Sequence, residues 1–241
     1  MLAHDAVRLP CGLVLATTSV EAPLTSLALA WADPSAGFVV GDGEVRWISP
    51  VGAVAVRAVR EWAPARPPQG PVAAGALAAV RAGLRGSDPG IDVGLLADFA
   101  AADRAAATAV ATSLLGAGPG LTPSGDDVLT GFLAGAAAFG IDATALREAT
   151  AVLAPARTTA LSAALLWHAA RGECIEELAG LAAVLTSQRP RGPEGAGPAV
   201  SRLLSVGHTS GAALALGLVT AAETALRAQA PFRVCTRTRD S

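Results

Sequence analysis

The chain has 241 residues, a formal net charge of −2 and a hydrophobic content of 52%. This length is sufficient to bury a large core, whereas the slightly acidic balance and 4% aromatic content exclude the basic or base-stacking surfaces of general nucleic-acid binding. All 18 basic residues are arginine, so mechanisms that need a lysine Schiff base, phosphate-binding lysine or lysine base are excluded too.

The first 62 residues carry short apolar or β-branched segments separated by turn signals. The segments are 13–17, 27–31, 38–40 and 45–48, and the sequence Gly41-Asp42-Gly43 favours a hairpin between the last two. We therefore predict a small antiparallel sheet in a β-rich N-terminal subdomain, residues 1–62. No basic region precedes its first apolar stretch, so a signal peptide is not expected.

Alanine-rich helical patterns dominate after a Pro-rich linker or exposed loop at residues 63–71. We predict helices at 72–83, 92–115, 127–140, 143–154, 158–171, 174–186, 198–205 and 210–228, with a surface loop at 188–198. The predicted fold class is therefore α+β, a small β-rich N-terminal part followed by a predominantly helical body. The helical domain, 72–241, carries the glycine-rich loops.

The longest apolar stretch, residues 203–222, is interrupted by glycine and polar residues near its start, which favours a buried helix over a membrane span. The three cysteines are widely separated and lack metal-ligand spacing, so we expect reduced thiols. These features predict a cytoplasmic protein without a membrane or nucleic-acid partner.

The sequence LLGAGPGLTPSGDD, residues 114–127, places glycines, prolines, hydroxyls and two acids where a helix is expected to begin. A helix start offers unpaired N–H groups to an anion, and glycine lets a ligand approach the backbone. Either Thr122, followed by Pro123, or Ser124 can serve as the N-cap. The candidate anion-binding residues of this loop are Gly118, Gly120, Thr122, Ser124 and Gly125.

Asp126 and Asp127 follow in the first turn, where the helix dipole stabilises negative charge. Paired carboxyls can hold Mg²⁺ that bridges to a phosphate. Alternatively, one carboxyl orients a substrate amide or acts as a general base. A purely structural connection, with acids that cap a helix, is the remaining interpretation.

A second loop repeats this chemistry ahead of another apolar helix. Its candidate binding residues are Gly207, Thr209, Ser210 and Gly211, and His208 adds a group that titrates near neutral pH and is a candidate catalytic residue. Small residues follow both loops, which permits close helix packing, so the two helix starts are expected to converge on one pocket.

A third cluster has polar residues spaced three or four apart. Thr158 and Ser162, with Thr159 and His168, share one broad helical face that can line the pocket, and Arg157 beside them is a candidate anion contact. The alternative is that the hydroxyls bond the preceding turn and that His168 and Arg157 serve no site.

At these residues the sequence resembles the AllH-like family, which is associated with a subunit of oxamate carbamoyltransferase. The resemblance rests on three segments, LLGAGPGLTPSGDDVLTGFLAG, TTALSAALLWHAARG and LLSVGHTSGAALALGL. It implies purine and allantoin nitrogen catabolism, in which a carbamoyl group moves between oxamate and phosphate. It also implies other carbamoyltransferase subunits as partners.

The first hypothesis is therefore a carbamoyltransferase subunit that binds a small anion such as carbamoyl phosphate or oxamate at the glycine-rich loops. Two alternatives remain. One is a Mg²⁺-dependent hydrolase or phosphotransferase that acts alone, with Asp126 and Asp127 as metal ligands. The other is a non-catalytic ligand-binding or structural subunit.

Overall fold

The computed structural model describes residues 64–97, 99, 103–186 and 195–229, together with the backbone of five short strands that precede them. The strands are β1 (Ala6–Arg8), β2 (Val14–Ala16), β3 (Gly37–Gly41), β4 (Glu44–Ser49) and β5 (Gly52–Arg57). β1 pairs with β2, and β3, β4 and β5 pair in that order, all antiparallel. The strand expected at 27–31 lies outside the described residues.

The predicted α+β class is wrong, because the packed body of the protein is all-α. Of the residues described with their side chains, 68% are helical and none belongs to a strand or sheet. Two isolated bridges, Ala65 with Cys174 and Val72 with Thr186, are the nearest approach to β-structure in that part of the chain. An α+β fold needs a sheet that shares a core with helices. The core of the described residues is instead built by helices and their connections.

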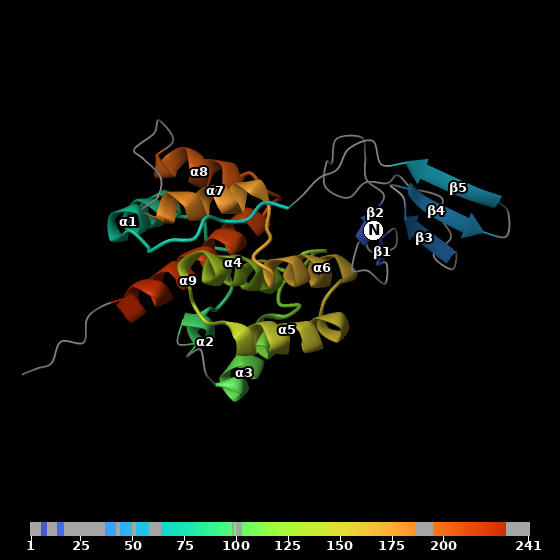
Figure 1. The fold of residues 1–241 in the computed structure, drawn as a ribbon. Coiled ribbons are helices and arrows are strands. Elements are labelled where there is room, and N and C mark those ends of the chain that lie inside the picture. The colour runs from blue at the N-terminus through green and yellow to red at the C-terminus, as the bar shows by residue number, and fades with distance from the viewer. Residues whose placement is uncertain are drawn as a thin grey trace, which may run out of the picture.

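The helices follow one another with short connections. They are α1 (Ala74–Gly83), α2 (Gly94–Ala97), α3 (Arg104–Leu114), α4 (Ser124–Phe139), α5 (Thr144–Arg157), α6 (Ala160–Ala169), α7 (Glu176–Leu185), α8 (Ala196–Leu204) and α9 (Ser210–Gln229). In Figure 1, α4 occupies the middle of this body, with α3 and α5 on one side and α7 and α8 on the other.

The single helix predicted over 92–115 is wrong. The structure has the short α2 and, after a break, α3. The Asp103 side chain accepts hydrogen bonds from the N–H groups of Ala105 (2.8 Å) and Ala106 (3.2 Å), so it caps a new helix at this point. The alanine-rich pattern continues on both sides of this cap, and periodicity alone therefore did not reveal the break.

The segment predicted as an exposed linker, residues 63–71, is bonded to the helical body in its described part. The Cys174 N–H donates to the Ala65 carbonyl (2.9 Å), and the Gly70 N–H donates to the Ala138 carbonyl (3.0 Å). Just beyond it, the Ala73 N–H donates to the Leu185 carbonyl (2.9 Å). The prolines and glycines of this segment disfavour a helix or strand, but the segment still forms backbone hydrogen bonds with the helical body.

α4 and α9 pack so closely that their backbones touch. A Cβ atom on Gly131 would lie 2.1 Å from the Leu214 carbonyl oxygen, and one on Gly217 would lie 2.0 Å from the Val128 carbonyl oxygen. Real Cβ atoms do not approach an oxygen this closely, so both positions require glycine. The pairing sets the two helices side by side along their length, with their N-terminal ends together.

α9 is long and apolar enough to cross a membrane by length and composition, but 61% of its apolar window is buried inside the protein. Its buried side includes Ala213, Leu214, Leu218 and Ala221. Burial of this kind is typical of a core helix, as the sequence predicted for this segment.

Candidate functional site

The two glycine-rich loops meet at the N-terminal ends of α4 and α9. The Thr122 and Ser210 hydroxyls lie 3.1 Å apart, and the Ser124 hydroxyl donates to the Thr209 hydroxyl at 3.5 Å. The expected convergence of the two helix starts is therefore present in the structure. It follows from the glycines at the α4–α9 contact, since bulkier residues there would separate the helices.

The hydroxyls of the first loop serve this contact and do not cap α4. α4 begins at Ser124 after Pro123, and its start has no side-chain cap, so both predicted capping arrangements are wrong. The N–H of Gly125 donates to the Ala117 carbonyl (2.8 Å), and those of Asp126 and Asp127 donate to the Pro123 carbonyl (2.9 and 3.2 Å). These three N–H groups are thus already satisfied and are not free donors for an anion.

Asp126 holds the glycine-rich loop in place. Its side chain is 1% exposed, its Oδ1 accepts from the Gly116 N–H at 2.9 Å, and its Oδ2 accepts from the Thr158 hydroxyl. Gly116 has a φ of 74°, a left-handed conformation that favours glycine. Both carboxyl oxygens are therefore engaged in fastening the loop to the start of α6.

Asp127 faces a cavity instead. Its side chain is 4% exposed, and its Oδ2 is buried without a hydrogen-bond partner among the described residues. Burial, opposed in part by the Ser210 hydroxyl, raises the pKa of Asp127 from 3.8 to about 7, with the neighbouring Asp126 adding to the rise. Near neutral pH this carboxyl is able both to donate and to accept a proton.

The cavity has a volume of about 270 Å³ and is lined by residues of α4, α6, α7 and α9 and of the segments that precede α4, α7 and α9, together with Pro64. Most of its wall is apolar, including Leu161, Leu165, Leu178 and Leu214. The polar residues of the wall are Thr122, Asp127, Thr130, His168, Glu173 and Ser210. An apolar wall with a few convergent polar groups is typical of a small-molecule site. We call this the Asp127 cavity.

His168 and Glu173 form a polar pair on the wall of the Asp127 cavity. His168 Nδ1 lies 2.8 Å from Glu173 Oε2, which leaves Nε2 as the ring nitrogen that Glu173 does not engage. Arg66 contacts the other Glu173 oxygen and also donates to the Arg171 carbonyl (3.1 Å). A histidine oriented by a carboxylate is a common arrangement for proton transfer.

The polar residues predicted to share one face of the 158–171 helix have two different roles. Some hold the glycine-rich loop and cap α6, and one lines the Asp127 cavity. Thr159 donates to the Leu121 carbonyl (2.6 Å) and accepts from the Ser162 N–H (3.1 Å), so it caps α6 and steadies the glycine-rich loop. Ser162 also donates to the Leu121 carbonyl, at 3.5 Å. Of this face, His168 lines the cavity.

Several predicted site residues lie elsewhere. His208 and Thr209 are exposed and do not line the Asp127 cavity, and Gly118 and Gly120 are exposed as well. Arg157 donates to the Thr112 carbonyl at 3.0 Å. Gly207 does line the cavity, whereas Gly211 is required for packing, because its Cβ would lie 2.0 Å from the Leu203 carbonyl oxygen.

Sequence reasoning did not find Glu173, Cys174 or Thr130 on the cavity wall. Glu173 and Cys174 follow Gly172, whose left-handed φ of 71° turns the chain back after α6. An Arg-Gly-Glu sequence directly after a helix was the available signal for this turn. Burial raises the pKa of the Cys174 thiol to about 12, so this thiol is protonated and unreactive at neutral pH. Cys11 and Cys235 lie outside the described residues.

The donor set does not fit the paired-aspartate Mg²⁺ site. Both oxygens of Asp126 are used within the protein, and Asp127 holds a proton up to neutral pH. Among the described residues, no group of three or more His, Cys, Asp or Glu side chains is placed to hold a metal ion. A hard cation needs several charged or neutral oxygens at once, and these two side chains do not supply them.

The described residues form an all-α body with a largely apolar cavity at two paired helix starts. The model of the family described as oxamate carbamoyltransferase subunit AllH matches residues 114–222. This match confirms the resemblance to that family over residues 114–222. The matched segment contains both glycine-rich loops, Asp127, His168 and Glu173. No solved structure matches the chain significantly.

Proposed function

We propose that this chain is a subunit of an oxamate carbamoyltransferase-like enzyme of purine and allantoin nitrogen catabolism, and that the Asp127 cavity binds its small substrate. The observation that carries the proposal is the buried Asp127 carboxyl, which faces a cavity and has an unpartnered oxygen. An unsatisfied buried oxygen is costly unless a ligand completes its bonding.

The chemistry of this oxygen suits a primary carboxamide. Carbamoyl phosphate and oxamate share the group H₂N–C(=O), whose N–H donates and whose carbonyl accepts. The Asp127 carboxyl would accept from the N–H, while one of the Thr122 and Ser210 hydroxyls, which otherwise bond to each other and to Asp127, would turn its single O–H to the carbonyl. The apolar wall would exclude water around this end of the substrate.

The anionic end of the substrate would lie toward the start of α9. α9 is 20 residues long, carries no acidic residue in its first turn, and begins at Ser210 on the cavity wall. Its positive dipole end would stabilise a phosphate or carboxylate near Gly207 and Ser210. The N–H groups of Gly125, Asp126 and Asp127 at α4 and of Gly211 at α9 are already bonded, so α9 would act mainly through its dipole, without the two acids that stand in the first turn of α4.

Asp127 would also serve as the general base. In carbamoyl transfer from carbamoyl phosphate, a bond forms between the oxamate nitrogen and the carbamoyl carbon, and the carbon–oxygen bond to phosphate breaks. The nitrogen loses a proton in this step, and Asp127 would take it. A carboxyl with a pKa of about 7 is matched to proton transfer near neutral pH. His168, which contacts Glu173 on the same cavity wall, would serve a second proton transfer.

The family description names a subunit, so we propose that turnover requires other carbamoyltransferase subunits in the cytoplasm. The test is co-purification of this chain with those subunits, followed by an assay of oxamate carbamoylation that depends on carbamoyl phosphate. We expect Asp127→Asn to lower turnover at least ~100-fold, the usual scale of a lost general base. Asp88→Asn, in an exposed turn, is the matched control and should leave turnover unchanged. Full activity of the Asp127→Asn complex would rule out this function for the cavity.

A further inference from the structure

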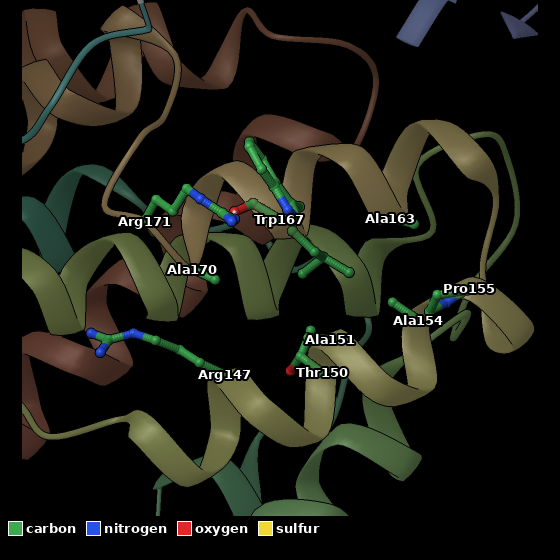
Figure 2. A pocket seen from close by; sticks show the side chains of 10 residues that line it. Arg147, Thr150, Ala151, Ala154, Pro155, Ala163, Trp167, Ala170 and Arg171 are labelled. Carbon is green, nitrogen blue, oxygen red and sulfur yellow. Dashed lines mark hydrogen bonds between the residues drawn. The ribbon is translucent and has the colours of Figure 1, made fainter. Parts of the chain in front are cut away.

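A second cavity, of about 170 Å³, lies between α5 and α6. Figure 2 shows its lining, with Arg147, Thr150 and Ala151 on α5, Ala163 and Trp167 on α6, and Ala170 directly after α6. On α6, the residues that line this cavity are separated by roughly half a turn from Leu161, Leu165 and His168, which line the Asp127 cavity. The two cavities are thus on opposite faces of one helix.

The α5–α6 cavity contains a buried hydroxyl with no partner. Thr150 is 2% exposed, and its Oγ1 has no hydrogen-bond partner among the described residues. Helical threonines ordinarily donate to the carbonyl one turn back. Thr220 and Thr224 of α9 do so at 2.9 Å each, whereas Thr150 does not. Leaving a buried hydroxyl unpaired is unfavourable, so a hydrogen-bond partner supplied by a ligand would stabilise this position.

Arg147 supplies a second unpartnered donor on the same wall. Its Nε is buried without a partner, and its position three residues before Thr150 places both side chains on one face of α5. Asp142, the carboxyl that interacts electrostatically with Arg147, is exposed and accepts from the Thr144 N–H at 3.0 Å. Among the described residues, Arg147 forms no salt bridge within 4 Å.

Apart from Arg171, the rest of the wall is apolar and includes Ala154, Ala163 and Leu166, together with the aromatic side chain of Trp167. The Arg171 guanidinium lies 3.3 Å from the centre of the Trp167 ring and donates to the Trp167 carbonyl at 3.0 Å. This stacking holds the ring at the cavity and adds a positive charge near it.

We propose that the α5–α6 cavity is a binding site for a small carboxylate with a short apolar tail. One carboxylate accepts from both Arg147 Nε–H and the Thr150 hydroxyl, and charge-assisted bonds of this kind are the strong ones. The tail packs against Ala154, Ala163 and Leu166. The proposal does not depend on the function of the Asp127 cavity.

The test is a titration of butyrate into the full chain, followed by the fluorescence of Trp167. The fluorescence change that disappears in the Trp167→Phe variant is the signal from this residue. We expect saturable binding with a dissociation constant on the order of 1 mM, as suits so small a ligand. Thr150→Val should weaken binding at least ~5-fold and Arg147→Met at least ~10-fold, because each removes one hydrogen bond to the carboxylate. Arg85→Met, on an exposed turn, and Asp127→Asn should leave it unchanged.

Thr150→Val preserves the shape of the side chain and removes the unpaired hydroxyl, so it should unfold at the same temperature as the wild type or higher. Loss of butyrate binding in this folded variant supports the site. The proposal is overturned if the wild type shows no saturable response, if 1-butanol binds as well as butyrate, or if Asp127→Asn abolishes binding while Thr150→Val does not.

Discussion

Asp126 and Asp127 are neighbours in the sequence but have opposite surroundings. Both oxygens of Asp126 accept hydrogen bonds from the loop it holds, whereas Asp127 Oδ2 is buried at a cavity with no partner. Adjacent residues on a helix point about 100° apart, so one carboxyl can fasten the loop while the next faces the cavity. This difference separates the aspartate that holds the loop from the one that we propose binds substrate.

The raised pKa of Asp127 makes the stability of the protein depend on pH. Between about pH 4 and pH 7 the unfolded chain has released this proton while the folded chain keeps it, so the free energy of unfolding falls as pH rises, by roughly 4 kcal/mol in total. Above pH 7 the contribution of Asp127 is lost and its pH dependence ends. Asp127→Asn should remove this fall, as measured by urea unfolding at pH 5, 6, 7 and 8. Parallel pH profiles of variant and wild type would contradict the assignment.

Asp126 and Thr158 should be energetically coupled. Asp126→Ala leaves the Gly116 N–H and the Thr158 hydroxyl unpaired, and we expect it to lower the free energy of unfolding by about 2 to 3 kcal/mol. Thr158→Val should cost about 1 kcal/mol alone and less in the Asp126→Ala background. Strictly additive effects in this double-mutant cycle would show that the contact contributes nothing.

The close approach of α4 and α9 predicts intolerance of any side chain at their crossing. Gly131→Ala and Gly217→Ala should each destabilise by about 2 kcal/mol or more, because the new methyl overlaps a backbone carbonyl. Gly180→Ala is the matched control within a helix, since a Cβ there meets no atom within 4 Å. It should stabilise by roughly 0.5 to 1 kcal/mol. Thermal unfolding of the three variants measures the contrast.

The pair of His168 and Glu173 should affect turnover and not assembly. Glu173→Gln keeps a hydrogen-bond acceptor for His168 but removes the carboxylate charge beside the imidazole. We therefore expect turnover of the assembled enzyme to fall, with co-purification unchanged. Full turnover in the Glu173→Gln complex would remove the His168–Glu173 pair from the proposed proton transfer.

Sequence reasoning located the glycine-rich loops and their meeting point, because glycine spacing on two apolar helices directly encodes close packing. The predicted fold class was wrong. β-branched segments such as 45–48 indicate strands, but the local sequence does not tell whether those strands share a core with the helices. His208 was favoured over His168 because it lies within a loop motif, yet it is exposed. His168 reaches the cavity through the turn at Gly172, a tertiary feature that local pattern does not specify.

The central claim is that the Asp127 cavity holds the carboxamide of the substrate. The most direct test is calorimetric titration of oxamate into the assembled complex at pH 7, with Asp127→Asn and the control Asp88→Asn in parallel. We predict that Asp127→Asn weakens oxamate binding at least ~10-fold, as expected for loss of one charge-assisted hydrogen bond, and that Asp88→Asn binds like the wild type. Equal oxamate affinity in all three complexes would contradict the claim.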